Sequence, residues 1–234
     1  MKKINLIVTA IILIFLYMPS SAQTQEFIVE KVTGKVSILR GTDENYQEVK
    51  SGQILNGTDL LVTDENSFIQ LSRNGGRFLL KANSALGLNF IKAISINDLL
   101  LALTAEEVRS IPKNNSATAK NTAVYGKKIG LEKNNKVNDL NFGLKKLNGA
   151  RQLAESGYKE SAVLVAKETY RKYPSTKSRV DERIYFADLL LRLGLKNEAL
   201  SEYSDIKSQQ LTIDQKNSLN KKIEEVSLAV TSDK

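Results

Sequence analysis

The chain has 234 residues, with 34 Lys and Arg against 26 Asp and Glu, and it contains neither Cys nor His. Without Cys it cannot form disulfides, a thiolate nucleophile, a Cys-ligated metal site or the lipid-modified cysteine of an acyl anchor. Without His it lacks the usual general base near neutral pH and the imidazole ligands of many metal sites. We therefore expect no cofactor and no metal, and any catalysis is confined to carboxylate, lysine or tyrosine chemistry.

The N-terminal residues have the pattern of a secretory signal. Lys2 and Lys3 precede an apolar segment over residues 6–18, and small residues follow up to Ala22. This order predicts a signal peptide over residues 1–22 with cleavage after Ala22. An uncleaved membrane anchor is the alternative, but the apolar segment is shorter than the roughly 20 residues that a spanning helix needs. We expect an exported protein in the periplasm, with secretion or the cell surface as alternatives.

Residues 27–90 have the pattern of short β-strands. Apolar residues alternate in short runs, and clusters rich in Gly, Asn and Asp separate the runs. This spacing predicts an all-β sandwich or roll. The string Thr-Asp-Glu-Asn occurs at 42–45 and again at 63–66, and neither copy has the alternating oxygen ligands and central glycine of a calcium loop. We interpret both copies as turns between strands.

The same region resembles the FecR-type domain over about residues 27–92. The resemblance is carried by the segments Val32-Thr-Gly34-Lys-Val36, Gly52-Gln-Ile-Leu55, Gly57-Thr-Asp59-Leu-Leu-Val-Thr63, Ser67-Phe-Ile-Gln-Leu71 and Asn74-Gly75-Gly76. It implies a β-stranded extracytoplasmic module, a Gram-negative source, and family-motif turns at Gly34, Gly52, Gly57, Asp59 and Gly75. Relatives of this type relay signals from an outer-membrane transporter to a sigma factor, and a sensing module without the sigma-factor arm is therefore one functional alternative.

Two segments connect the β region to the rest of the chain. Residues 97–112 are rich in Leu and Ala, and Thr104-Ala-Glu-Glu107 has the spacing of a capping box, so one bent helix or two short ones are expected. The apolar face of this segment is expected to pack on the β module, or else in the groove of a partner. Residues 113–137 are rich in lysine, and we interpret them as a basic linker. Nucleic acid is not expected as a partner, because this basic run has a single aromatic residue, Tyr125.

The region 138–234 has helical periodicity and an internal repeat. The pairs Ala150/Ala187, Leu153/Leu190, Gly157/Gly194 and Ala162/Ala199 are each separated by the same number of residues. This constant offset predicts two helical hairpins, each with a left-handed glycine at the end of its first helix. The apolar spacing over residues 218–230 predicts a closing amphipathic helix.

Gly157-Tyr-Lys-Glu-Ser-Ala162 and Gly194-Leu-Lys-Asn-Glu-Ala199 resemble the tetratricopeptide repeat. Repeats of this family bind peptides or proteins in a groove lined by their first helices. The register then implies a candidate partner groove, which would be lined by Lys146, Asn148, Gln152, Arg183, Tyr185 and Phe186. Two units are fewer than the three that such repeats usually need, so docking on the β module or a homodimer through the helical domain is expected.

Catalysis by paired carboxylates receives little support from the sequence. The adjacent pairs 106/107, 181/182 and 224/225 lie in predicted helices, where neighbouring side chains point about 100° apart, and they are interpreted as solvated helix faces. Ser204 and Lys207 match the S-x-x-K spacing of penicillin-binding proteins, but the other motifs of that family are absent. We expect a protein that is not an enzyme and has no catalytic residues.

Together these observations predict a multidomain α and β protein. The predicted order is a signal peptide (1–22), a FecR-like β domain (23–96), a short helical extension (97–112), a basic linker (113–137) and a tetratricopeptide-like helical domain (138–234). The expected function is a non-catalytic envelope scaffold or adaptor that binds other envelope proteins or peptides. The alternative is an envelope protein that binds glycan or peptidoglycan, with the basic linker attracted to anionic polymers.

Overall fold

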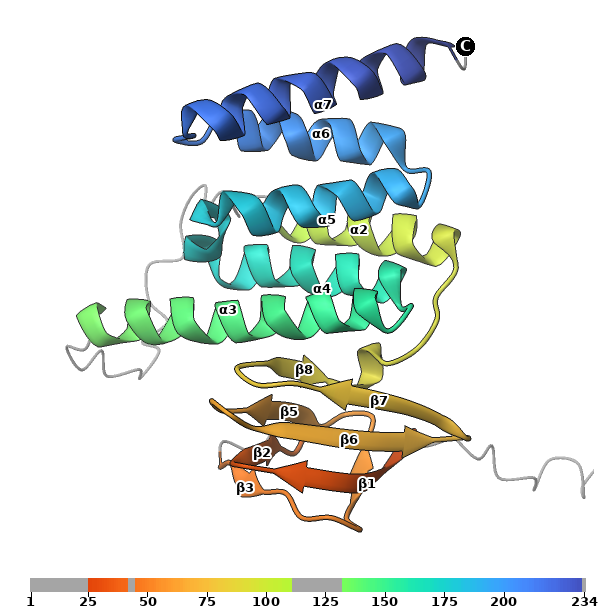
Figure 1. The fold of residues 1–234 in the computed structure, drawn as a ribbon, viewed down its shortest axis with the longest axis vertical. Coiled ribbons are helices and arrows are strands. Elements are labelled where there is room, and N and C mark those ends of the chain that lie inside the picture. The colour runs from red at the N-terminus through yellow and green to blue at the C-terminus, as the bar shows by residue number, and fades with distance from the viewer. Residues whose placement is uncertain (1–24, 42–44, 111–131, 233–234) are drawn as a thin grey trace, which may run out of the picture.

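The computed structural model describes residues 25–41, 45–110 and 132–232, and it describes no side chains for residues 132–138 and 232. The predicted cleavage site at Ala22, most of the first copy of the Thr-Asp-Glu-Asn string and most of the predicted basic linker lie outside these residues. In Figure 1 the described β-strands form one end of the molecule and the helices are stacked above them. The prediction of an N-terminal β part and a C-terminal helical part is confirmed at this level.

The β part consists of two antiparallel four-stranded sheets. Their strand orders are β4-β1-β6-β7 and β3-β2-β5-β8. The strands are β1 (Glu26–Thr33), β2 (Val36–Leu39), β3 (Gln47–Glu48), β4 (Ile54–Asn56), β5 (Leu60–Thr63), β6 (Phe68–Arg73), β7 (Gly76–Leu80) and β8 (Ala85–Gly87).

Alternation along β1 shows why this segment forms a strand with one buried face. Phe27 and Val29 are buried, whereas Ile28 is half exposed. The pairing of β1 with β6 shifts register between Val29 and Lys31, which marks a β-bulge. Beyond this irregularity the strand no longer buries every second residue.

The turns of the β part use the residues that the motif analysis singled out. Gly34, Gly52 and Gly75 all have positive φ, between 69° and 82°. Gly34 is required for a second reason, since a Cβ there would collide with Ser67. Asp59 is buried, and its carboxylate accepts a hydrogen bond of 2.8 Å from the backbone N–H of Asn56. Gly57 has no room for a side chain because Gln25 lies against it. These five residues therefore shape turns, and the FecR-type resemblance itself stays a prediction.

The helical part follows a short 3-10 turn, η1 (Leu88–Phe90). Its helices are α2 (Ile96–Ser110), α3 (Glu132–Glu155), α4 (Lys159–Lys172), α5 (Val180–Arg192), α6 (Lys196–Lys207) and α7 (Ile213–Ser232), and η2 (Pro174–Ser178) lies between α4 and α5. Helix α3 begins at Glu132, within the range expected as basic linker, so the boundary predicted at residue 137 was wrong. Helix α7 covers the predicted closing helix, and Leu219 and Val226 are buried in it.

The two hairpins are structurally equivalent at the turns that join their helices. Gly157 and Gly194 have φ of 92° and 80°. At the first turn the N–H of Tyr158 bonds to Leu153 O, and at the second the N–H of Leu195 bonds to Leu190 O. Both turns are therefore Schellman caps, as the constant sequence offset predicted.

Helix α2 differs from its predicted form in two ways. It is continuous, and Thr104 lies in its interior with its hydroxyl bonded to Leu100 O, so the predicted capping box at Thr104 was wrong. The helix is capped instead by Ser95, whose hydroxyl accepts from the N–H of Asp98 and donates to the Asp98 carboxylate. The buried residues Leu99 and Leu103 belong to a helix packed on α4, whereas packing on the β module was expected.

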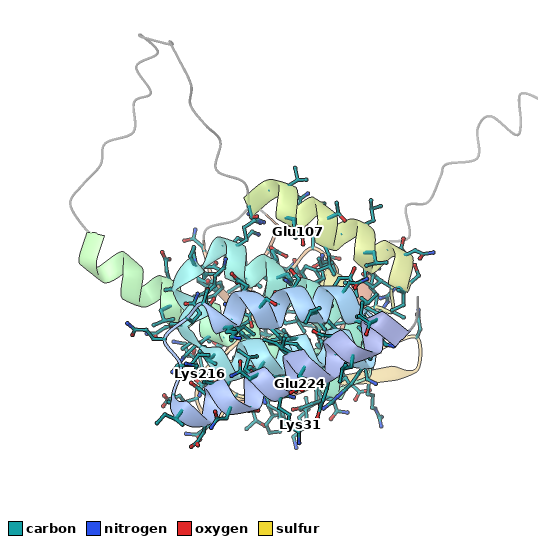
Figure 2. The ribbon with its side chains drawn as sticks, turned by 90° about the horizontal axis from the view of Figure 1, so that it is seen from above. Lys31, Glu107, Lys216 and Glu224 are labelled. Carbon is teal, nitrogen blue, oxygen red and sulfur yellow. The ribbon has the colours of Figure 1, made fainter. Side chains whose placement is uncertain are left out.

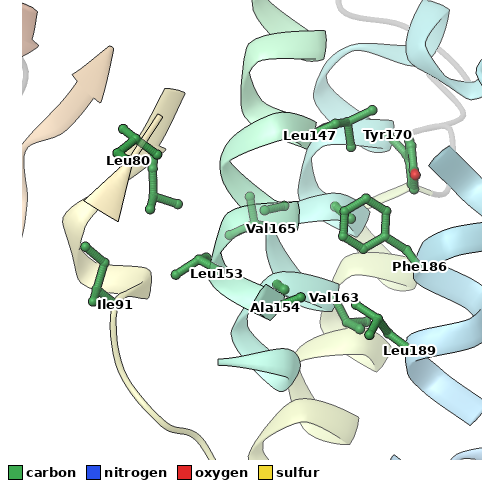
Figure 3. Packing of buried hydrophobic residues seen from close by; sticks show 14 of the residues in the cluster. Leu80, Ile91, Leu147, Leu153, Ala154, Val163, Val165, Tyr170, Phe186 and Leu189 are labelled. Carbon is green, nitrogen blue, oxygen red and sulfur yellow. The ribbon is translucent and has the colours of Figure 1, made fainter. Parts of the chain in front are cut away.

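A continuous apolar core joins the β part to the helical part. Figure 3 shows Leu153 of α3 between Leu80 and Ile91 of the β part on one side and Val165 of α4 on the other. The contact is closest where α3 crosses β8. A Cβ added at Gly149 would collide with the carbonyl oxygen of Ala85. The absence of a side chain at this position lets the helix backbone lie directly on the strand.

We predict that Gly149→Ala destabilises the protein, although the same change in an exposed helix interior stabilises by about 1 kcal/mol. The added methyl group must push α3 away from β8, at a cost of about 2 kcal/mol. Asn220→Ala, at an exposed position of α7, is the control and should leave stability unchanged or slightly raised. Equal or higher stability of the Gly149 variant in urea unfolding would show that α3 and β8 are not in close contact.

Candidate functional site

The six residues of the predicted groove do not come together in the structure. Asn148 and Gln152 lie on α3 and face the β part. The Asn148 amide donates to Asn83 O at 2.9 Å. Gln152 accepts from the backbone N–H of Lys81 at 2.6 Å and donates to Ser84 Oγ at 2.7 Å. Both side chains therefore connect the helical part to the β part by hydrogen bonds, and Gln152 is buried at this interface.

The other groove residues lie elsewhere. Lys146 is buried on the side of α3 that meets α4, and burial together with the charge of Lys172 lowers the pKa of its ammonium, against the opposing effect of Glu168. Phe186 is buried in the core, and its ring lies 5.1 Å from that of Tyr185. Tyr185 is partly buried beneath the guanidinium of Arg151, which is centred 4.2 Å from the ring. The predicted groove was wrong as a single surface because most of its residues are in internal contacts.

Arg183 is the sixth residue, and it lies in a buried cluster of charges between α4, α5 and α6. Its side chain is 2% exposed, and it bonds to the Glu202 carboxylate at 2.7 Å and to Asp205. Lys167 of α4 pairs with the other oxygen of Glu202. This cluster joins consecutive hairpins by charge-assisted hydrogen bonds within the helical layer.

Glu202 is ionised within this cluster. Burial by itself would raise the pKa of this carboxyl, but the charges and hydrogen bonds of Lys167 and Arg183 outweigh it, so that its pKa is lowered below the usual value. Two cations thus balance Glu202 and Asp205 at the place where a lone buried charge would be costly.

A second ion pair attaches α2 to the same region. Glu106 of α2 is buried and accepts hydrogen bonds from Arg171 of α4 at 2.5 Å and from Arg109 at 2.6 Å. The interpretation of every adjacent carboxylate pair as a solvated helix face was therefore wrong for Glu106. Figure 2 shows Glu107 on α2 and Glu224 on α7, on opposite sides of the helical layer in that view, so these two pairs lie apart from each other.

These two ion clusters border a pocket, which we call the α2 pocket. Its volume is about 150 Å³, and it is lined by residues of α2, α4, α5 and α6 and by Lys177. It lies on the side of the second helices of the hairpins, whereas the predicted groove belonged to the first helices.

Two buried donors in the lining of the α2 pocket have no acceptor among the described residues. They are Tyr170 Oη and Arg183 Nη1, and both residues are at most 4% exposed. The Arg183 guanidinium lies 5.8 Å from the centre of the Tyr170 ring. Burial raises the pKa of the Tyr170 hydroxyl well above its ordinary value, so it keeps its proton and remains a donor. Buried polar groups are almost always paired, so these two unpaired donors are the feature of the pocket lining that most calls for an acceptor.

The rim of the α2 pocket carries charges of both signs. Lys167 and Arg171 are paired with Glu202 and Glu106, whereas Glu107, Glu198 and Lys177 have no partner of opposite charge within ion-pair distance among the described residues. The lining holds five carboxylates against four cations. The rim can therefore attract a basic group, while the two buried donors can donate hydrogen bonds to an oxygen below it.

Sequence reasoning missed most of this site. Its one detectable signal lies in α6, where Ala199, Glu202 and Ile206 follow helical spacing and place a carboxylate among buried positions. A charge at a core position demands a counterion, and the basic residues of the neighbouring helices were the available partners. The residues of α2 gave no such signal. Their contact with α4 joins two segments that residues 111–131 separate in the sequence, and a local sequence pattern does not indicate a contact of that kind.

Further searches add little to this geometry. The described residues contain no cluster of acidic side chains that could hold a metal ion. None of their helices is long and apolar enough to cross a membrane. Comparisons with protein-family models, curated proteins and solved structures found no match.

We predict that the stability contributed by Glu202 is lost in acid. Because its folded pKa is lowered, its contribution is full above the unfolded value of about 4.3 and disappears as the pH falls through the folded value. Glu202→Gln should destabilise the protein at pH 7 by about 3 kcal/mol, because it leaves Arg183 and Lys167 less well paired.

Unfolding in urea from pH 7 to pH 2 measures both effects. The difference between wild type and Glu202→Gln should shrink as the pH falls below about 4. Glu225→Gln, at an exposed position of α7, serves as the control and should follow the wild-type curve. A difference that stays constant across the pH range would mean that Glu202 is not ionised in the folded protein.

Proposed function

We propose that this protein is a non-catalytic, exported scaffold of the cell envelope that binds a segment of another envelope protein in the α2 pocket. The observation that carries the proposal is the pair of buried donors, Tyr170 Oη and Arg183 Nη1, in the lining of an open pocket. Peptide carbonyls are neutral oxygen acceptors, and they suit two donors whose surroundings already contain balanced ion pairs.

The character of the rim favours a basic side chain in the bound segment. Glu107 and Glu198 lie in the lining without a cationic partner among the described residues, so a Lys or Arg beside the bound carbonyl would form an ion pair with one of them. The small volume of about 150 Å³ suits one or two residues of an extended segment more than a folded surface. The partner is thus an envelope protein with an exposed, basic, extended segment.

The packing of the two parts supports a scaffold role. Gln152, Asn148 and Gly149 attach α3 directly to the β part, so a partner bound at the helices is held at a fixed position relative to the sheets. Preorganised surfaces of this kind lose little entropy when they bind. The signal-like pattern of the N-terminal sequence supports the proposal that this function lies outside the cytoplasm.

Photo-crosslinking in intact cells tests the proposal. A photoreactive phenylalanine at Ser201, an exposed residue of the pocket lining, should capture a discrete polypeptide. The same group at the exposed and distant Asn220 is the control and should not capture it.

Tyr170→Phe is the decisive variant, because it keeps the ring and removes only the hydroxyl. Loss of one buried hydrogen bond to a partner should weaken capture and affinity about three- to tenfold. The free protein should be as stable as wild type or more stable, since the change removes an unpaired buried hydroxyl. Undiminished capture by Tyr170→Phe, or equal capture from Asn220, would contradict the proposal.

A further inference from the structure

A second pocket lies at the junction of the β part with the turn between α3 and α4. We call it the junction pocket. It has a volume of about 200 Å³, and its lining includes three cations, Arg73, Arg77 and Lys92, and three aromatic residues, Phe27, Phe78 and Tyr158. None of the described residues that line it is acidic.

Two of the three cations have no counterion among the residues that the structure describes. Arg77 pairs with Glu30 at 3.0 Å. For Arg73 and Lys92 the described part of the chain offers no carboxylate within ion-pair distance, and the Arg73 guanidinium lies 5.3 Å from the centre of the Phe27 ring. The junction pocket therefore carries uncompensated positive charge beside an apolar floor, in contrast to the mixed charges of the α2 pocket.

The backbone around the pocket is held firmly and adds to its positive potential. Ser161 Oγ donates to Lys92 O at 2.7 Å, which fixes the Lys92 backbone against α4. Tyr158 precedes the first residue of α4, and no side chain caps this end of the helix. The unpaired N–H groups of the first turn, and the positive end of the helix dipole, thus begin beside the pocket, where Glu160 of the same turn offsets part of the dipole.

The aromatic residues determine what kind of anion fits. Phe27 and Phe78 are buried beneath the pocket, and the partly exposed Tyr158 ring, 6.4 Å from that of Phe78, is the aromatic surface that a ligand can reach. Such a surface suits the C–H face of a sugar ring, and two cations without a counterion among the described residues suit an oxyanion on that ring. The volume is smaller than that of most small-molecule sites, which limits the ligand to a single ring.

We propose that the junction pocket binds an acidic sugar, with its carboxylate or phosphate on Arg73 and Lys92 and its ring against Tyr158. This site is separate from the α2 pocket and does not depend on the protein partner proposed above. A ligand held there contacts both the sheets and the α3–α4 turn, so it also stabilises the docking of the two parts.

Calorimetric titration of the full chain with matched sugars tests this proposal. The probes are N-acetylmuramic acid, which carries a carboxylate, N-acetylglucosamine 6-phosphate, which carries a phosphate, and neutral N-acetylglucosamine. At least one acidic sugar should bind and the neutral one should not, and the stronger of the two identifies the source as cell-wall glycan or phosphorylated glycan. Binding should weaken as salt is raised.

Variants locate the site. Arg73→Gln and Lys92→Gln should each weaken binding about tenfold or more, because each removes a charge-assisted hydrogen bond. Lys50→Gln, which removes an exposed charge of the β part outside the pocket, should leave the affinity unchanged. Tyr170→Phe should also leave it unchanged, so failure here is distinguishable from failure of the protein-binding proposal.

Three results would overturn the proposal. They are the absence of binding by both acidic sugars, equal binding of neutral N-acetylglucosamine, and undiminished binding by both Arg73→Gln and Lys92→Gln. Inorganic phosphate that binds as tightly as the sugars would also count against it, since the ring contact with Tyr158 would then contribute nothing.

Discussion

The crossing of α3 over β8 is the contact on which the rest of the structure depends. At Gly149 the helix backbone lies so close to Ala85 that no side chain fits between them. On either side of this point, Asn148 and Gln152 satisfy backbone groups of the segment that leads into β8. Close packing and directional hydrogen bonds therefore act at the same place, and they fix both the distance and the orientation of the helix.

Both candidate pockets follow from this arrangement. The junction pocket exists because α3 ends near the β6–β7 hairpin and brings Tyr158 beside Phe78. The α2 pocket lies on the other side of the helical layer, where α2 adds a helix to the second helices of the hairpins. The first pocket is lined by cations and aromatic residues, and the second by balanced ion pairs with spare donors, so the two surfaces suit different ligands.

The parts of the fold that follow from local patterns were predictable. The offset between Gly157 and Gly194 gave both hairpins and their left-handed turns, because a Schellman cap is decided by a few neighbouring residues. Contacts between distant segments were not predictable in this way. Gln152 looked like a groove residue because its helix position is polar, yet it is buried against Lys81 and Ser84.

The candidate sites show the same limit. Arg183 was singled out for the wrong reason, since repeat register placed it in a groove and the structure places it among Glu202, Asp205 and Lys167. The capping box was sought at Thr104, inside the predicted extension 97–112, whereas the helix is capped by Ser95 and Asp98, a pair that begins before that range. An N-terminal boundary placed two residues after the capping serine therefore led to the wrong cap.

The ion pair between Glu106 and Arg171 has a consequence for how the chain is held together. Helix α2 precedes residues 111–131 and α4 follows them, while α3, which also follows them, lies on strand β8 from before them. The segments on either side of that stretch are thus joined by several contacts, among them one between helices and one between a helix and a sheet. Because these contacts do not depend on covalent continuity, we expect the two pieces of a chain cut within residues 111–131 to stay associated.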